Sequence, residues 1–243
     1  MLTLAIDAGN TLIKCAVYNQ SELMSVESYS EWTAEAFEKL RSRYPSIGAC
    51  LICSTRKVPE WLPGLMDNMG IRYNELTHQT PLPLGIGYET PGTLGKDRIA
   101  AAAGAVDRFP GRNIAVIDAG TALTIDVVTG EPFFLGGNIS PGMRMRFHAL
   151  HTQTYSLPLV EPGPDVPLIG RNTRQAILSG VVNGLTYEID NSINSLKNKY
   201  NDLAVIITGG DAPYLASRLK NTIFVDENLV LNGLNAILRN FSE

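Results

Sequence analysis

The chain has 243 residues, of which 44% are hydrophobic and 18% are charged, so it can fold around one large core or two smaller ones. This composition excludes an intrinsically disordered chain. The formal net charge is −4 and there is no dense run of Lys or Arg, which argues against a nucleic acid partner.

No apolar stretch approaches the length of a membrane span, and the amino terminus lacks the basic lead of a secretory signal. The three cysteines are too few, and odd in number, for a disulfide framework. We therefore expect a cytoplasmic protein that binds neither a membrane nor nucleic acid.

The chain alternates apolar runs of strand length with segments of helical periodicity. In the first half we predict strands at 2–7 and 12–18, a helix at 33–44, a strand at 48–54, a helix at 59–69, a loop at 81–95 and a helix at 98–109. In the second half we predict strands at 113–118 and 123–128, a loop at 161–170, a helix at 172–196, a strand at 203–208 and a helix at 229–241. The fold class is therefore α/β.

One repeat of long period is present. Segment 4–13 aligns without a gap with segment 115–124, an offset of 111 residues (118 − 7). In each copy a buried strand ends in an aspartate, Asp7 or Asp118, and a small-residue turn leads to another apolar strand. We predict two related domains, 1–112 and 113–243, which meet where Pro110 and Gly111 interrupt the chain.

Both turns have the composition of a phosphate-binding loop. Gly9 and Gly120 lack a Cβ atom, so main-chain N–H groups can approach an anion closely. Lys14 can add a positive charge, and side-chain donors are available from Asn10, Thr11 and Thr121. An aspartate beside polyphosphate requires an intervening cation, which Mg²⁺ held through water by Asp7 would provide.

The same residues also make a good hairpin turn, and a single Asp-Ala-Gly-Asn sequence does not distinguish the two interpretations. The duplication favours phosphate binding, because a two-lobed ATP site needs one such loop from each lobe.

Four motifs in order carry a resemblance to a known family: 7–11 (DAGNT), 88–98 (YETPGTLGKDR), 118–126 (DAGTALTID) and 136–142 (GGNISPG). A weaker fifth motif is 170–173 (GRNT). The pattern resembles the actin-like ATPase superfamily, which includes sugar kinases and the heat-shock chaperone ATPase domain. Within that superfamily it is most similar to the type III pantothenate kinases, over nearly the whole chain.

The resemblance implies two related actin-like (ribonuclease H-like) domains with an ATP cleft between them. It implies ATP-dependent phosphorylation of pantothenate to 4′-phosphopantothenate, the first step of coenzyme A biosynthesis. Members of the family are typically homodimers in which the pantothenate site is completed near the subunit interface.

The resemblance also implies site residues. Asp97 matches the proton acceptor, and Asp118 matches a site for a monovalent cation, K⁺ or NH₄⁺. The implied ATP-binding residues are Asp7, Ala8, Gly9, Asn10, Thr11, Leu12, Ile13, Lys14 and Thr121. The implied pantothenate-binding residues are Tyr88, Gly95, Lys96, Asp97, Arg98 and Thr173. Arg98 suits the carboxylate of pantothenate, although pairing with a neighbouring acid is the alternative.

Two other functions stay open at this point. One is a kinase of the same superfamily that acts on a sugar or acetate. The other is a regulatory ATP-binding protein without catalysis, such as a transcriptional activator. The 88–98 and 136–142 motifs argue against the other kinase, and the intact Asp97 and the net charge of −4 argue against the regulatory protein.

Four smaller features are assigned structural roles. Cys50 and Cys53 spell CxxC, but residues i and i+3 of a strand point to opposite faces, so we expect core positions. His148 and His151 lack an acidic companion at helical spacing and are expected to be structural or solvent-facing. We expect Arg144 and Arg146 on a solvated face, with contact to phosphate or a partner subunit as the alternative. The Gly209-Gly210 turn either flanks adenosine or is a tight turn only.

Overall fold

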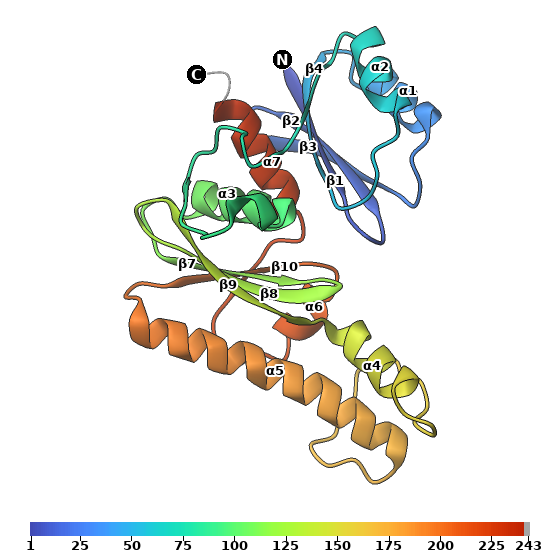
Figure 1. Ribbon diagram of the computed structural model, residues 1–243, viewed down its shortest axis with the longest axis vertical. Helices are drawn as coiled ribbons and strands as arrows, with labels where there is room; N and C mark the ends of the chain where they lie inside the picture. Colours follow the sequence, from blue (N-terminus) through green and yellow to red (C-terminus); the bar gives the residue numbers. More distant parts are fainter. Residues whose placement is uncertain (241–243) are drawn as a thin grey trace. The chain divides into compact units, whose positions relative to one another are not determined.

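The computed structural model describes residues 1–240, and its chain forms two compact units, each built on a β-sheet (Figure 1). The first unit comprises Met1–Gly111, Glu131–Phe134 and the chain from Asn228 onward. The second comprises Arg112–Gly130 and Leu135–Glu227. These units are discontinuous in sequence, whereas the predicted domains, 1–112 and 113–243, are continuous; the domains stay a prediction.

The first unit has a five-stranded sheet in the order β3-β2-β1-β4-β5. Strand β1 is antiparallel to β2 and parallel to β4. The strands are β1 (Leu2–Ala8), β2 (Ile13–Asn19), β3 (Glu22–Tyr29), β4 (Ile47–Ser54) and β5 (Arg72–Glu75). The helices are α1 (Ala34–Arg43), α2 (Trp61–Asn68), α3 (Lys96–Arg108) and α7 (Leu229–Asn240).

The two faces of this sheet have different neighbours because successive strand residues point to opposite sides. Leu4, Ile6 and Ala8 of β1 share a buried cluster with residues of α1 and α2. On the other face, the Thr3 hydroxyl donates to Asn235 Oδ1 of α7 at 2.7 Å. Asp7 has the parity of Thr3, so it lies on the α7 face.

The second sheet has the strand order β11-β10-β7-β8-β9-β6. Its strands are β6 (Gly85–Ile86), β7 (Ile114–Ala119), β8 (Ala122–Val128), β9 (Phe133–Pro141), β10 (Ala204–Thr208) and β11 (Phe224–Val225). The remaining helices are the 3-10 turn η1 (Pro91–Thr93), α4 (Met143–Thr152), α5 (Thr173–Lys199) and α6 (Ala212–Ala216). Helix α5 runs along one face of the sheet of the second unit (Figure 1), where it shares a buried cluster with Ala115, Ile117 and Ile207.

The two sheets repeat one strand order, which extends the duplication seen in the sequence. The order β3-β2-β1-β4-β5 corresponds to β9-β8-β7-β10-β11 in the second unit. Strand β7 is antiparallel to β8 and parallel to β10, as β1 is to β2 and β4. The predicted α/β class is confirmed, and the repeated segment is the central strand pair of each sheet.

Some predicted elements were wrong. No strand was predicted over the 136–142 motif, but most of it is strand β9, since pairing in the sheet overrides the weak strand propensity of its glycines. The loop 81–95 contains β6 and η1. The helix predicted from 98 begins two residues earlier, at Lys96. Residue 241, the predicted end of the last helix, lies outside the described residues.

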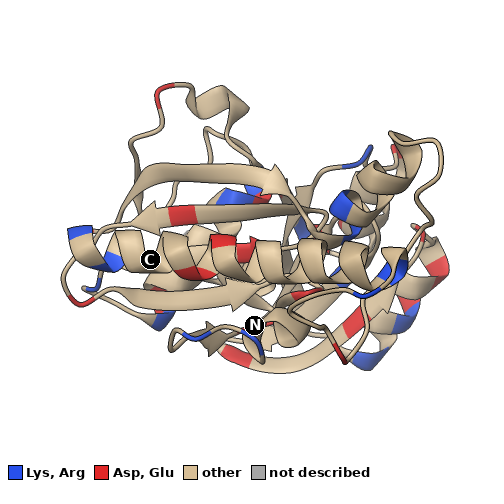
Figure 2. Cartoon of the chain, turned by 90° about the horizontal axis from the view of Figure 1, so that it is seen from below, with Lys and Arg blue, Asp and Glu red and all other residues tan. Residues whose placement is uncertain are grey.

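Charged residues of both signs are interspersed along the ribbon (Figure 2). Among the described residues, no helix is both long enough and apolar enough to cross a membrane.

Candidate active site

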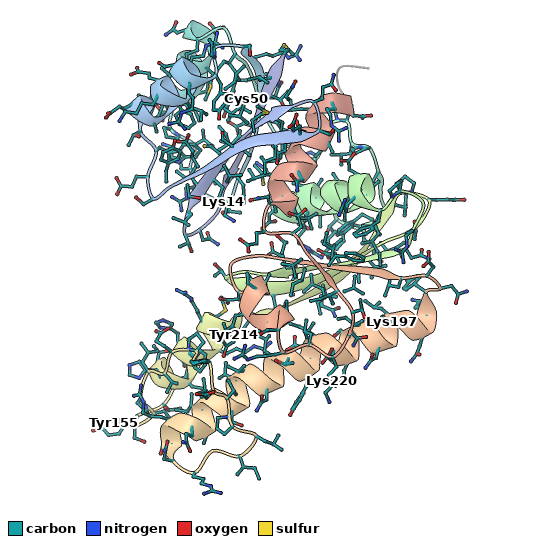
Figure 3. The ribbon with its side chains drawn as sticks, turned by 180° about the vertical axis from the view of Figure 1, so that it is seen from behind. Lys14, Cys50, Tyr155, Lys197, Tyr214 and Lys220 are labelled. Atoms are coloured by element: carbon teal, nitrogen blue, oxygen red, sulfur yellow. The ribbon has the colours of Figure 1, made fainter. Side chains whose placement is uncertain are left out.

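The first predicted phosphate loop joins β1 to β2. Asp7 lies opposite Lys14 in the antiparallel pair and beside Cys53 in the parallel pair with β4. These three side chains therefore share the α7 face, where Figure 3 labels Lys14. The structure thus brings the predicted carboxylate and ammonium groups together at the carboxyl end of β1.

The loop itself, residues 9–12, closes through its own backbone. The Gly9 N–H donates to the Leu12 carbonyl at 3.0 Å, so this N–H is used within the turn rather than offered to an anion as expected from the sequence. Asn10 and Thr11 are exposed, whereas Ala8 and Ile13 are fully buried. Of the predicted ATP-binding residues, Ala8 and Ile13 can therefore contribute only backbone atoms.

Asp97 lies in the first turn of α3, where the sequence placed it between a loop and a helix. Its Oδ1 accepts a hydrogen bond from the Arg98 N–H at 2.9 Å. A Cβ atom on Gly95 would lie 2.5 Å from the same oxygen, so a larger residue at position 95 would displace the carboxylate. Glycine at position 95 thus leaves the space that the Asp97 carboxylate occupies, which gives a physical reason for its place in the motif.

Asp7 and Asp97 interact electrostatically. Burial, followed by the nearby Asp97 carboxylate, raises the pKa of Asp7 from 3.8 to about 6, and Lys14 opposes that shift. The charge of Asp97 therefore disfavours the ionised form of Asp7. A cation beside them would relieve both the burial cost and the repulsion.

Tyr88 and Arg98 form a second cluster with Phe134. The Arg98 guanidinium lies 5.5 Å from the centre of the Tyr88 ring and 5.7 Å from that of Phe134. Arg98 is 7% exposed, so these cation–π contacts are largely shielded from water. Sequence reasoning predicted Tyr88 and Arg98 but missed Phe134, which belongs to no motif and reaches them through the pairing of β6 with β9.

The second predicted phosphate loop, residues 120–121, joins β7 to β8. The Gly120 N–H donates to the Ala122 carbonyl at 3.1 Å, again within the turn. The Gly142 N–H donates to the Thr121 carbonyl at 3.2 Å, and a Cβ on Gly142 would overlap the carbonyl oxygens of Gly120 and Thr121. The 136–142 motif therefore ends in direct contact with this loop.

The Gly209-Gly210 turn also packs on the second loop. Gly209 has φ +94°, and a Cβ there would overlap the Asp118 carboxylate, so glycine is required on both grounds. The Asp211 N–H donates to the Ala119 carbonyl at 3.0 Å. Burial raises the pKa of Asp211 above its usual value, and the positive charge of Arg144 partly opposes that shift. Arg144, at the start of α4, therefore lies near enough to this turn for its charge to act on Asp211.

Each loop offers only some of the oxygen ligands that a hard cation requires. Within residues 1–240, no three His, Cys, Asp or Glu side chains gather where they could hold a metal ion. A cation beside Asp7 or Asp118 would take its other oxygen ligands from backbone, water or nucleotide, as Mg²⁺ and K⁺ accept. The residues present fit such a shared site and do not form an all-protein cage.

Thr173, the last predicted substrate residue, is exposed at the first position of α5. The preceding Asn172 caps the helix by accepting from the Gln175 N–H at 2.9 Å. Within the described residues, no hydrogen bond joins Thr173 to another predicted site residue.

Of the four features set aside from the sequence, most have the expected role. The cysteines are buried, and Cys50, labelled in Figure 3, lies in the α1 and α2 cluster while Cys53 has the opposite parity. Both histidines are exposed. Arg146, expected on a solvated face, instead pairs with Glu188 of α5 at 2.5 Å, because the turn after β9 lies against that helix.

Two sheets of matching strand order, each with an aspartate near the end of a central strand (β1 or β7) and a glycine turn after it, are typical of the actin-like fold. A glucokinase from an Antarctic psychrotroph shares this fold at 13% identity, with a TM-score of 0.51 over 98% of this chain and 99% of that one. The sequence profile of the type III pantothenate kinases matches residues 3–195. The chain belongs to the type III pantothenate kinase family.

Relatives in that family match along almost the full length. The type III pantothenate kinase of Christiangramia forsetii is 42% identical over 238 residues, which is 98% of each chain. That of Phocaeicola vulgatus is 40% identical over 237 residues, again 98% of each. The resemblance inferred from five short motifs therefore holds for the whole chain.

Proposed function

We propose that the protein is a pantothenate kinase that transfers the γ-phosphoryl group of ATP to pantothenate, giving 4′-phosphopantothenate in the first step of coenzyme A biosynthesis. The observation that carries this proposal is the convergence of Asp7, Lys14 and Asp97 in a chain of this family. Phosphoryl transfer needs positioning, charge neutralisation and a base, and these residues are of the types that provide them.

Asp97 is the proposed base. The pantothenate hydroxyl oxygen forms a bond to the γ-phosphorus, the bond from that phosphorus to the bridging oxygen of ADP breaks, and the hydroxyl proton passes to the Asp97 carboxylate. The Arg98 N–H holds this carboxylate at the start of α3, in space left by the absence of a Cβ at Gly95. Helix α3 is 13 residues long and well packed, so the base sits on a rigid element.

The proposed ATP contacts come from both loops. Lys14 supplies a positive charge, and the loop at residues 9–12 supplies backbone and side-chain donors. Thr121, exposed in the second loop, adds a hydroxyl. Ala8, Leu12 and Ile13, which were also predicted to bind ATP, are proposed to contact it through main-chain atoms.

Pantothenate is proposed to bind beside Tyr88 and the 95–98 segment. The Arg98 guanidinium, flanked by two aromatic rings, would receive its carboxylate. Thr173 is proposed to help bind pantothenate. We also propose a homodimer in the cytoplasm, with the pantothenate site completed near its interface.

Two cations complete the proposal. Asp7 would hold Mg²⁺ through water, and Asp118 would hold K⁺ or NH₄⁺. Such cations neutralise charge on the transferring phosphoryl group, and the glycine backbones around Asp118 leave room for close approach.

The test is an assay of ADP release with pantothenate, a sugar and acetate offered in parallel. Release with pantothenate alone, faster in K⁺ or NH₄⁺ than in Na⁺, is the expected result. Release with a sugar or acetate would favour the other kinase function. Nucleotide binding without ADP release on any substrate would favour a regulatory ATP-binding protein.

A further inference from the structure

The segment that follows β4 forms hydrogen bonds to the backbone at the start of the first phosphate loop. Because β4 runs parallel to β1, both strands end at the same edge of the sheet. The Thr55 N–H and hydroxyl both donate to the Ala8 carbonyl, at 3.1 and 3.2 Å. The next residue, Arg56, donates its Nε to the Gly9 carbonyl at 2.8 Å.

The Arg56 side chain is itself anchored at a second point. Its Nη1 donates to the Ser30 carbonyl, in the segment between β3 and α1, at 3.3 Å. A guanidinium offers several N–H donors in a fixed planar geometry, so two carbonyls at two positions define where the group lies. The loop carbonyl at Gly9 is therefore fixed with respect to two other parts of the first unit.

Fixing this carbonyl also fixes the N–H of Asn10. The two groups belong to one peptide unit, which is trans and planar, so they point in opposite directions. With the Gly9 carbonyl turned to Arg56, the Asn10 N–H is directed away from Arg56. The carbonyl is also kept from turning toward an anion that the loop binds, where it would repel the charge.

We infer that Arg56 is a positioning residue for the phosphate groups of ATP, acting through the Gly9–Asn10 peptide and adding a positive charge beside the loop. This inference rests on the proposed function, because it takes the loop at residues 9–12 as an ATP phosphate site. Thr55 has a counterpart in the second unit, where the Asp211 N–H donates to the Ala119 carbonyl. Arg56 adds a side-chain contact to that shared backbone pattern.

The experiment compares Arg56→Gln with Arg41→Gln. Arg41 is the matched control, because it is also partly exposed and donates from Nη1 to a backbone carbonyl, that of Ile47, at 2.7 Å. That contact lies at the opposite end of the same strand, β4. KM for ATP, KM for pantothenate, direct binding of a fluorescent ATP analogue with Mg²⁺, and the thermal midpoint are measured for each variant.

We expect Arg56→Gln to weaken nucleotide binding and raise KM for ATP by roughly 10-fold or more, since a charged hydrogen bond is lost. KM for pantothenate should stay within about two-fold of the wild-type value, because the Arg56 side chain donates to the carbonyls of Gly9 and Ser30, neither of which is a predicted pantothenate residue. Arg41→Gln should leave both KM values unchanged, while it lowers the thermal midpoint by about as much as Arg56→Gln does. Equal effects of the two variants on ATP would overturn the inference.

Arg56→Lys distinguishes positioning from charge alone. The lysine keeps the positive charge but has one ammonium group in place of the planar fork, so it should recover only part of the ATP affinity. Full recovery would overturn the positioning role. If Arg56→Gln does not fold, the ATP affinity of Arg56→Lys, compared with that of the wild-type protein, decides the inference.

Nucleotide binding is measured directly so that the two proposals fail separately. If the wild-type protein binds nucleotide but does not phosphorylate pantothenate, the proposed substrate is wrong, and the binding comparison still decides the role of Arg56. If the wild-type protein binds no nucleotide, both proposals are wrong.

Discussion

Asp7 and Asp97 are two carboxylates on one side of the first unit, and their surroundings give them different chemistry. Asp97 is held at a helix start by a backbone N–H and faces partly into solvent. Asp7 lies at the end of a buried strand, where burial and the charge of Asp97 both favour its neutral form. In the proposed function Asp97 accepts the proton of the substrate, and Asp7 holds a cation whose charge would offset the cost of its burial.

The Asp97→Asn substitution separates chemistry from binding. The amide keeps the size of the side chain but cannot take the hydroxyl proton, so we expect kcat to fall by about 10²–10⁴-fold. Nucleotide affinity should change by less than about three-fold, because the ATP loop is intact. Asp107→Asn on the same helix, which breaks only an ion pair with Arg239, is the control. Full turnover by the Asp97 variant would remove this residue from the mechanism.

The raised pKa of Asp7 predicts a cost in stability that depends on pH. The pKa is about 6 in the folded protein and 3.8 ordinarily, so the folded state prefers the protonated form. Stability from this group is fully present below about pH 4 and is lost as the pH rises through about 6. Asp7→Asn, which cannot ionise, should therefore raise the free energy of unfolding of the ligand-free protein above pH 6, by up to about 3 kcal/mol.

The measurement is urea unfolding of both proteins without nucleotide at pH 7.5 and pH 4.5. The advantage of the Asp7→Asn variant should shrink at the lower pH. The same variant should lose binding of the nucleotide with Mg²⁺. A variant that is less stable than the wild-type protein at pH 7.5 would contradict the proposed cause of the shift.

At the scale of elements, the position of Asp97 depends on how α3 crosses α7. The two helices touch through glycines, since a Cβ on Gly233 would overlap the Ala100 carbonyl and lie 2.8 Å from the Gly104 nitrogen. Small residues at this crossing let the two backbones approach closely. Helix α7 also bonds the sheet through Asn232, which accepts from the Tyr18 hydroxyl at 2.7 Å.

Gly233→Ala should therefore destabilise the protein, although alanine has a higher helix propensity than glycine. Alanine normally stabilises a helix interior by roughly 0.5–1 kcal/mol relative to glycine. Here we expect a loss of about 1–3 kcal/mol from overpacking, with a lower kcat because α3 carries Asp97. Gly184→Ala on α5 is the control: nothing lies within 4 Å of its added Cβ, so the usual gain should appear. Chemical denaturation measures both, and a gain at position 233 would contradict the crossing geometry.

The sequence predicted the elements with clear periodicity and missed those that depend on long-range pairing. Strand β1 and helix α5 have strong apolar patterns, and both were predicted within a few residues. Strand β9 contains Gly136 and Gly137 and depends on its place in the sheet, so no strand was predicted there. Arg56 gave no sequence signal, because its partner is a backbone carbonyl 47 residues away.

At the scale of the whole molecule, the duplication was visible in ten residues but is expressed in five strands of each sheet. Within the aligned segments, identical side chains cluster at the strand end and the turn, where both copies read Ile-Asp-Ala-Gly. Elsewhere the same strand order is built from different sequences, since many apolar residues satisfy a buried strand. The paired loops could therefore be found from sequence alone, while the contacts that hold each of them could not.

The last prediction concerns the interface of the proposed homodimer. Leu135 and Ile139 lie on one face of β9 and are 40% and 65% exposed, an apolar surface that a second copy could cover. Ile139→Asp should shift the protein from dimer to monomer in sedimentation velocity, because a carboxylate would be buried in the interface. KM for pantothenate should rise while nucleotide binding persists, since the pantothenate site is proposed to be completed near the interface. Val225→Asp, at a 47% exposed position on the opposite edge strand β11, is the control and should stay dimeric. A dimer that survives Ile139→Asp would place the interface elsewhere.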